Sequence, residues 1–460
     1  MTYDVVIIGS GLGGLECAHI LSRRGMNVLV LERQAQPGGC MQSYPRHGMH
    51  YDTGLHYIGG LDEGQALHAD FERLNLLRLP WQRLDADGFD RITIGGQTFR
   101  FAEGYDRFAD TLAQDFPQER EALHRYVAML QKNDMTMDVS AWDYMNTLFH
   151  DPLLIQVLGG SALKMELRKE SLPLFVFAHG NASFIESSWR LKGDGNLLVL
   201  SLIDDIKANG GTIVCKAEVT ELVDNDERIV AARCSNGETY EGRAFISDAH
   251  PAVTCSLTKM LKPIYRRRMT MAENTGGMLT VSLRLKPKAL SYFNHNHFVY
   301  DEANVWDTPQ RIDRVMVGCR VPEDDNLQVD LLTPLPWAWC ERWADTTLGR
   351  RGDDYERQKE QWADRCLQLA ERVVPGLCDI VAERYISTPL TYRDYTLTPQ
   401  GSAYGMRKDW QNPLFSLLSV STPVSNLLLT GQSLMLHGVE GVTRTAMITC
   451  DTLMGMKNGK

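Results

Sequence analysis

Residues 4–32 constrain the fold of this chain more than any other segment. A short β-branched run at residues 5–8 is typical of a buried parallel strand. Gly9, Gly11 and Gly14 follow it and form the pattern G-x-G-x-x-G where a strand would turn into a helix. The first glycine permits the tight turn, the second lets a pyrophosphate approach the backbone, and the third lets the helix pack closely on the strand. The pattern predicts a strand–turn–helix unit that binds a dinucleotide.

A second apolar run and an acidic residue complete this unit. Residues 28–31 read Val-Leu-Val-Leu, and Glu32 follows them, where its carboxylate can accept hydrogen bonds from a ribose hydroxyl pair. The alternative is a structural βαβ turn without a ligand. On these residues alone the dinucleotide could be NAD, NADP or FAD.

The composition is that of an ordinary globular protein. The chain has 460 residues, of which 43% are hydrophobic and 23% charged, so two intertwined domains are expected rather than one core. The formal net charge of -10 leaves no basic excess to neutralise phosphates. We therefore expect no nucleic-acid partner.

The cysteines and the start of the chain bear on its location. The ten cysteines are scattered from Cys17 to Cys450 with no C-x-x-C pair, which favours reduced thiols over disulfides or a zinc site. Because the chain has no signal-peptide pattern and no apolar stretch of about twenty residues, a cytoplasmic protein without a spanning helix is expected. Peripheral contact with the inner face of a membrane stays open, with the apolar run at 172–178 as its candidate and a buried strand or core helix as the alternative. His295 and His297 lack a third ligand at metal-binding spacing, so no metal site is expected.

The order of the expected elements divides the chain into two interleaved parts. Residues 1–105, 190–265 and 405–460 are assigned to the nucleotide-binding domain, and residues 106–189 and 266–404 to a substrate-binding domain. Four extended runs in the second part predict an antiparallel sheet, namely residues 279–285, 297–300, 315–321 and 327–332. The sequence therefore predicts an α/β fold in which a Rossmann-like domain carries an inserted α+β domain.

Other elements are expected from periodicity and turn residues. A hairpin at 92–101 turns at Gly95 and Gly96, and a strand at 426–429 runs into a glycine turn. Helices are expected at 13–24, 106–137, 142–167, 195–207, 355–373 and 441–456.

Several motifs of this chain occur together in one known group of flavoproteins. They are residues 9–14 with Glu32, 37–40, 51–59, 388–405, and 426–432 followed by 438–441. In this order they resemble the family of phytoene desaturases, carotenoid isomerases and retinol saturases, and the run at 52–59 is closest to the retinol saturase and carotenoid isomerase branch. The resemblance implies FAD as the cofactor and a fold like that of the glutathione reductase and amine oxidase group.

The same resemblance implies which residues hold FAD. The glycine loop would receive the pyrophosphate, Glu32 the adenosine ribose and Val219 the adenine, while Thr53 and Gly54 would lie near the isoalloxazine ring. The residues implied in cofactor binding are Gly9, Ser10, Gly11, Leu12, Gly13, Gly14, Glu32, Arg33, Gly38, Gly39, Cys40, Met41, Thr53, Gly54, Val219, Gly431, Gln432 and Glu440.

Glu440 is a departure from the family pattern, because many relatives carry a proline in this turn. A carboxylate that faced the ring would oppose an anionic reduced flavin. The alternative is a Glu440 that is solvated or paired with Arg444.

Two histidines and three tyrosines are candidates for substrate chemistry. His56 and His437 each lie in a flavin-edge motif and are the candidate catalytic residues, as proton donors or relays. The alternative is that they only shape the loops by hydrogen bonding. Tyr57, Tyr395 and Tyr404 could line a substrate tunnel or supply a phenolic proton, with a place in the core as the alternative.

Together with the dinucleotide motif, the resemblance implies an FAD-dependent oxidoreductase that acts on carbon–carbon double bonds of a hydrophobic isoprenoid or polyene, by hydride transfer at flavin N5. No second G-x-G-x-x-G unit is visible, so NAD(P)H is expected at most as a transient reductant. The alternatives are a redox-neutral cis–trans isomerase, an amine oxidase-like enzyme, for which Lys164, Lys192 and Lys216 offer no motif, and a non-enzymatic prenyl-binding escort protein. The substrate, the direction of reaction and the oligomeric state stay open.

Overall fold

The computed structural model describes residues 2–132, 134–321 and 327–458. Its first sheet has seven strands in the order β10-β2-β1-β13-β12-β11, with β19 also paired to β13. Strands β10, β2, β1, β13 and β19 run parallel, and β12 and β11 extend the sheet in antiparallel fashion. The strands span Thr2–Ile8 (β1), Val28–Leu31 (β2), Thr212–Val214 (β10), Val219–Asp224 (β11), Ile229–Cys234 (β12), Thr239–Ser247 (β13) and Leu427–Leu429 (β19).

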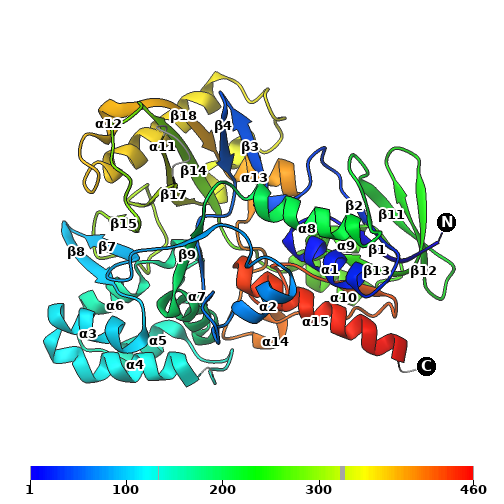
Figure 1. Ribbon diagram of the computed structural model, residues 1–460, viewed down its shortest axis with the longest axis horizontal. Helices are drawn as coiled ribbons and strands as arrows, with labels where there is room; N and C mark the ends of the chain where they lie inside the picture. The colour runs from blue at the N-terminus through cyan, green and yellow to red at the C-terminus, as the bar shows by residue number, and fades with distance from the viewer. Residues whose placement is uncertain (1, 133, 322–326, 459–460) are drawn as a thin grey trace.

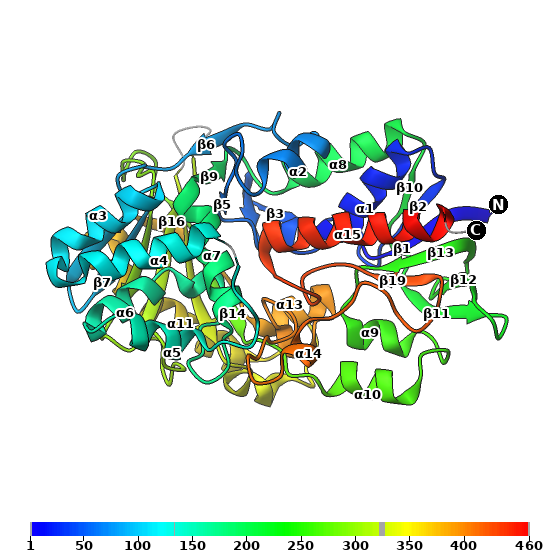
Figure 2. The same ribbon diagram turned by 90° about the horizontal axis from the view of Figure 1, so that it is seen from below.

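Alternate residues of β1 pack on the two faces of this sheet. Val5 and Ile7 belong to a buried cluster with helices α1, α8 and α15, whereas Val6 and Ile8 belong to a cluster on the other face. The three helices lie side by side in both views (Figures 1 and 2). They span Leu12–Arg23 (α1), Asn196–Ala208 (α8) and Gly438–Asn458 (α15). The predicted Rossmann-like domain is confirmed.

The second sheet also has seven strands, in the order β18-β14-β17-β16-β15-β7-β8. All its neighbouring strands are antiparallel except β15 and β7, which run parallel. The strands span Asp90–Ile94 (β7), Gln97–Phe101 (β8), Gly277–Leu285 (β14), Asn296–Tyr300 (β15), Arg314–Cys319 (β16), Gln328–Leu335 (β17) and Val381–Ser387 (β18). The predicted inserted domain with an antiparallel sheet is confirmed.

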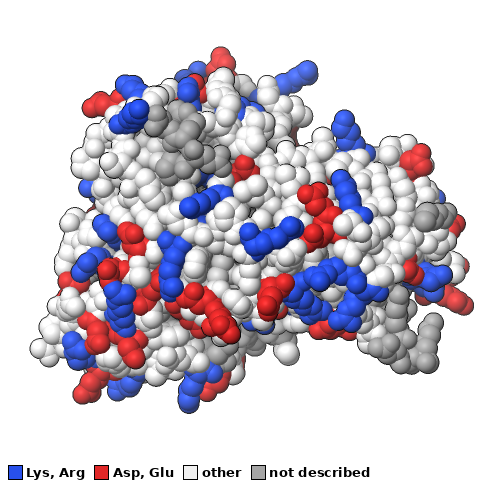
Figure 3. All heavy atoms as spheres, viewed as in Figure 1, with Lys and Arg blue, Asp and Glu red and all other residues white. Residues whose placement is uncertain are grey.

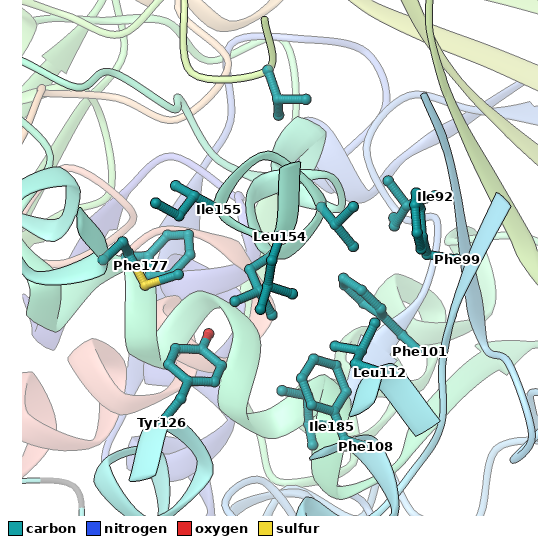
Figure 4. Packing of buried hydrophobic residues seen from close by; sticks show 14 of the residues in the cluster. Ile92, Phe99, Phe101, Phe108, Leu112, Tyr126, Leu154, Ile155, Phe177 and Ile185 are labelled. Carbon is teal, nitrogen blue, oxygen red and sulfur yellow. The ribbon is translucent and has the colours of Figure 1, made fainter. Parts of the chain in front are cut away.

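Helices cover both faces of the second sheet. On one face a large core joins Ile92 and Phe101 to Leu154 and Phe177 (Figure 4). The helices of this face are α3 (Tyr105–Asp115), α4 (Arg120–Lys132), α5 (Ala141–Leu148), α6 (Pro152–Gly159) and α7 (Leu174–Glu186). On the other face α11 (Asp353–Ala370) packs against the strands.

Shorter elements connect the two sheets. Two small sheets pair β3 with β4, and β5 and β6 with β9. The remaining elements are β3 (Ser43–Arg46), β4 (Met49–Asp52), β5 (Ile58–Gly59), β6 (Trp81–Arg83), β9 (Ser188–Leu191), α2 (His68–Arg73), α9 (Pro251–Ser256), α10 (Pro263–Met271), α12 (Leu377–Ile380), α13 (Pro389–Thr396) and α14 (Pro413–Ser416).

The hairpin at 92–101 forms as predicted, but it lies in the second sheet. β7 pairs with β15, and Ile92 and Phe99 are buried in the core beneath α3 and α4. The predicted nucleotide-binding domain includes residues 1–105 and therefore this hairpin. The predicted domain boundary thus does not follow the sheets. The reason is that β15 lies some 200 residues away in sequence, and no residue of the hairpin indicates β15 as the partner of β7.

The apolar run at 172–178 forms the start of α7 in the core. Leu174, Val176, Phe177 and Ala178 are buried there, so this segment does not present a surface to a membrane. Among the described helices, none combines the length and the apolarity that crossing a bilayer requires. Acidic and basic side chains are interspersed over the face seen in Figure 3.

Candidate functional site

The glycine loop between β1 and α1 has the geometry that its sequence predicts. Gly9 has a φ of +95°, which favours glycine, and its N–H donates to the Leu31 carbonyl at 2.9 Å. A Cβ on Gly14 would lie 2.3 Å from the Gly9 carbonyl oxygen, so only glycine allows α1 to approach β1 this closely. Gly11 precedes α1, and no side chain caps the helix from that position.

Asp248, at the end of β13, faces this loop and was not predicted. A Cβ on Gly11 would lie 2.4 Å from its Oδ2. Burial raises the pKa of Asp248 to about 7, against the hydrogen bonds that the Gly14 and Gly11 N–H groups donate to the carboxylate. Its place at the carboxyl end of a parallel strand beside β1 is the signal that could have identified it.

Glu32 is buried and fully hydrogen-bonded. Its carboxylate accepts bonds from the Ser10 N–H at 3.0 Å, the Ser10 hydroxyl at 2.5 Å and the Gln34 N–H at 2.7 Å. It therefore ties the glycine loop to the end of β2 at the point where a ribose is expected. The Arg33 guanidinium donates to the carbonyls of Asp394 and Tyr395 at 2.7 and 2.9 Å.

A first cavity of about 460 Å³ runs along this loop, within the size range of cofactor sites. Most of the residues implied in cofactor binding line it: Gly9, Ser10, Gly11, Leu12, Gly13, Glu32, Arg33, Gly39, Cys40, Met41, Val219, Gly431 and Gln432. Gly14 and Gly38 lie outside its wall. The Gly38 N–H instead donates to the Ser10 carbonyl at 3.0 Å and so stabilises the glycine loop.

A second cavity of about 200 Å³ adjoins the first. The two share Cys40, Met41, Gln432, Gly438 and Val439. Of the predicted site residues, the second cavity is lined by Thr53, Gly54, His56, Tyr57, Tyr404, His437 and Glu440. Its other walls are largely apolar and come from α7 and the second sheet, with Val176, Phe184, Met278, Met316 and Leu332.

Tyr395 does not join the other two tyrosines. It is 43% exposed and lines the first cavity. The Arg33 guanidinium donates to its carbonyl, so the structure places Tyr395 beside the glycine loop and not in the second cavity.

The two histidines are neutral at physiological pH. Burial lowers the pKa of His56 and that of His437 to about 4. The tyrosine hydroxyls are already committed, since Tyr57 donates to Asp90 Oδ2 at 2.9 Å and Tyr404 donates to the Leu163 carbonyl at 2.5 Å. Near pH 7 none of these four side chains carries a charge that the substrate could meet.

Lys164 lies in the second cavity and was missed as a site residue. Its Nζ sits 4.0 Å from the centre of the Phe184 ring, and burial lowers its pKa to about 8, which the charge of Asp90 partly opposes. Lys164 belongs to no motif, and no residue spacing around it indicates a site. An amine with a pKa near neutrality, in an otherwise apolar cavity, is suited to donate or accept a proton.

Glu440 lies half-buried in the wall of the same cavity. Burial raises its pKa, while a hydrogen bond with the Ser183 side chain and the charge of Arg444 oppose the rise. The Arg444 guanidinium itself lies 3.3 Å from Asp70 Oδ2. The expected pairing with Arg444 is thus a charge interaction at a distance rather than a direct bond.

A buried ion-pair network holds the His56 segment against the second sheet. Arg320 pairs with Asp52 and with Asp330, the latter at 3.1 Å, and Asp52 also accepts the Gly195 N–H at 2.7 Å. These contacts tie β4 and the start of α8 to β17. The network thus fixes where His56 enters the cavity.

A third cavity of about 210 Å³ continues from the second. The two share Leu163, Met278 and Tyr404. The described residues include no group of three or more His, Cys, Asp or Glu side chains placed to hold a metal ion. The Nε2 atoms of His295 and His297 lie 3.1 Å apart, outside all three cavities.

Comparisons with known proteins agree with this architecture. A family model described as an NAD(P)-binding Rossmann-like domain matches residues 7–74. All-trans-retinol 13,14-reductase of Danio rerio is 26% identical, over 99% of this chain and 86% of that protein. Prolycopene isomerase 2, chloroplastic, of an Oncidium hybrid cultivar is 23% identical, over 94% of this chain and 80% of that protein. Cyclohexylamine oxidase of Brevibacterium oxydans has the same fold, with a TM-score of 0.69 at 14% identity over the whole of both chains.

These matches confirm the resemblance drawn from the motifs. The chain is similar over nearly its whole length to all-trans-retinol 13,14-reductases and prolycopene isomerases. The findings support an oxidoreductase-type enzyme with a dinucleotide or flavin site.

Proposed function

We propose that this protein is an FAD-dependent oxidoreductase that saturates or desaturates a carbon–carbon double bond in a hydrophobic isoprenoid or polyene. The observation that carries the proposal is the meeting of two cavities at residues 40–41 and 438–439. One is bounded by the glycine loop, and the other is mainly apolar with few polar groups. Such an arrangement would bring a bound cofactor into contact with a hydrophobic substrate.

The residues of the first cavity fit FAD. The cavity passes from Val219 along the glycine loop to Gly431 and the start of α15, so it extends well beyond a single βαβ unit. The glycine loop and the turn at Gly431 lie too close together for a side chain, since a Cβ on Gly13 would lie 3.1 Å from the Gly431 nitrogen. The N-termini of α1 and α15 both border it and favour negative charge. When bound, FAD would supply hydride transfer at its N5 atom.

The second cavity would position the substrate and exclude water. It is lined by Val176 and Phe184 of α7 and by Met278, Met316 and Leu332 of the second sheet. Apolar walls of this kind bind a polyene through the apolar surface that they bury, and they exclude water from the reacting bond. Thioether side chains suit a substrate of irregular shape because they adapt to gaps.

Lys164 is the proton donor that this arrangement favours. Saturation of a double bond by hydride needs a proton at the neighbouring carbon, and the Lys164 ammonium is largely retained near pH 7. His56 and His437 are neutral there and could relay a proton but not start the transfer. In the direction of desaturation the neutral Lys164 amine would accept the proton instead.

Product analysis distinguishes this proposal from its alternatives. Purified protein with FAD and a chemical reductant is incubated without oxygen with retinol, lycopene isomers and phytoene, and products are separated and weighed by mass spectrometry. A saturase adds two hydrogens, a desaturase in the presence of an acceptor removes two, and an isomerase changes retention time without changing mass. An amine substrate that alone is turned over would contradict the proposal, and so would tight lipid binding without any product.

We further propose that α10 and α14 form a peripheral membrane surface. Ile264, Met271, Leu414 and Phe415 are 74%, 67%, 83% and 62% exposed. Arg268 joins the two elements, because its guanidinium bonds to the Leu414 carbonyl and lies 4.9 Å from the centre of the Phe415 ring. Further positive charge lies in and just before α10, at Lys259, Lys262, Arg266 and Arg267. Exposed apolar side chains framed by basic ones favour an anionic bilayer surface.

Replacing both Leu414 and Phe415 with glutamate is expected to release the protein from vesicles rich in phosphatidylserine. The change removes the two most exposed apolar contacts of α14 and adds charges that the lipid repels. Co-sedimentation with vesicles measures it, with Leu348→Glu as the control, because Leu348 is 53% exposed and belongs to neither α10 nor α14. Equal sedimentation of the double variant and the control would contradict this surface.

A further inference from the structure

Arg168 stands out among the charged residues that line the third cavity. Glu166, Asp307, Arg314 and Arg407 line it as well. Its apolar wall includes Leu163 and Met278, which it shares with the second cavity. An elongated molecule held at Lys164 could therefore extend past Leu163 into this space.

The other charges of the wall neutralise one another or neighbouring groups. Arg407 donates to both oxygens of Glu166, at 2.7 and 3.1 Å. Lys169 Nζ lies 2.6 Å from Asp307 Oδ1. Arg314 Nε lies 2.7 Å from Asp313 Oδ1.

Arg168 has no such partner. Its guanidinium makes no ion pair with any carboxylate in the part of the chain that the structure describes, and its Nε is shielded from solvent without a hydrogen bond. A shielded polar group without a partner costs free energy, and the cost is larger for a charged one. Among the described residues that line the third cavity, Arg168 thus carries the positive charge that no carboxylate pairs.

Building on the proposed function, we propose that Arg168 binds the terminal carboxylate of the substrate. The substrate class is then a hydrophobic isoprenoid or polyene acid. A guanidinium presents parallel N–H donors that match the two oxygens of a carboxylate. One uncommitted cation matches a single negative charge, whereas a diphosphate would need more. The apolar chain would fill the second cavity, with the acid group held at Arg168.

Binding of two matched probes tests this assignment. All-trans-retinoic acid and all-trans-retinol have the same polyene and differ in the end group. With the FAD-loaded protein at low salt, dissociation constants are measured by titration calorimetry for the wild type, Arg168→Met and Arg168→Lys. Arg357→Met is the matched control, because Arg357 is a solvent-exposed arginine of α11 that lines none of the three cavities.

The wild type is expected to bind the acid at least about tenfold more tightly than the alcohol, as a charge-assisted bond implies. Arg168→Met is expected to lose this preference and bind the alcohol as before, Arg168→Lys to keep part of it, and the control to keep all of it. Equal binding of both probes by the wild type, or an unchanged preference in Arg168→Met, would overturn the site and leave the proposed function standing. A wild type that retains FAD but binds neither probe would overturn the site and the proposed substrate class together.

Discussion

Gly11→Asp is expected to lose FAD almost completely. A Cβ at this position would lie 2.4 Å from Asp248 Oδ2, so the loop would have to move before any ligand binds. The new carboxylate would also lie beside Asp248 and in the path of the pyrophosphate, where juxtaposed like charges cost several kcal/mol. The FAD-to-protein ratio after purification and reconstitution, read from the absorbance spectrum, should fall by about tenfold or more.

Gly455→Asp is the matched control for this change. Gly455 lies near the end of α15, and apart from its neighbours and its own helix backbone no described atom lies within 4 Å of the place where its Cβ would be. Glu32→Gln is a second, milder variant, because it keeps the shape of the buried side chain and removes the charge that faces the expected ribose. It is expected to fold and to hold FAD more weakly. A folded Gly11→Asp protein with the wild-type FAD content would show that the pyrophosphate lies elsewhere.

Lys164→Met is expected to keep FAD and to lose most of the activity. General acids contribute about 10²- to 10⁴-fold to rates, and methionine keeps the apolar volume while removing the proton. The measurement is a single turnover without oxygen, in which reduced enzyme is mixed with the polyene and the return of flavin absorbance is followed. In the direction of saturation the wild-type rate should fall as the pH rises through about 8, because the ammonium is then lost. This pH dependence should be absent in the variant.

Lys192→Met is the control, because Lys192 is exposed and lies outside the three cavities. His437→Gln is expected to slow the reaction less than Lys164→Met does, since the neutral imidazole brings no proton of its own near pH 7. If Lys164→Met reacted at the wild-type rate with the same pH profile, the proton would have to come from another group.

The glycine loop and the sheets could be predicted because their causes are local. Gly9 and Gly14 are required by a turn and a close approach within 32 residues of chain, and the alternation in β1 repeats every two residues. The partner of β7 could not be predicted, because strand pairing across 200 residues depends on tertiary packing.

The substrate side could be predicted only in part. His56, Tyr57, Tyr404 and His437 do line one cavity, but Tyr395 does not. Lys164 and Arg168 carry the charges that distinguish this region, yet neither belongs to a motif. The role proposed for Lys164 depends on its burial, and that for Arg168 on the partner that its Nε lacks. Neither property can be recognised in the local sequence.

The absorbance spectrum of the purified protein tests the central claim most directly. We expect flavin bands, release on denaturation of a cofactor with the mass of FAD, and return of the bands when reduced protein meets a polyene substrate without oxygen. A colourless protein that takes up no FAD on reconstitution, although it is folded, would contradict the account.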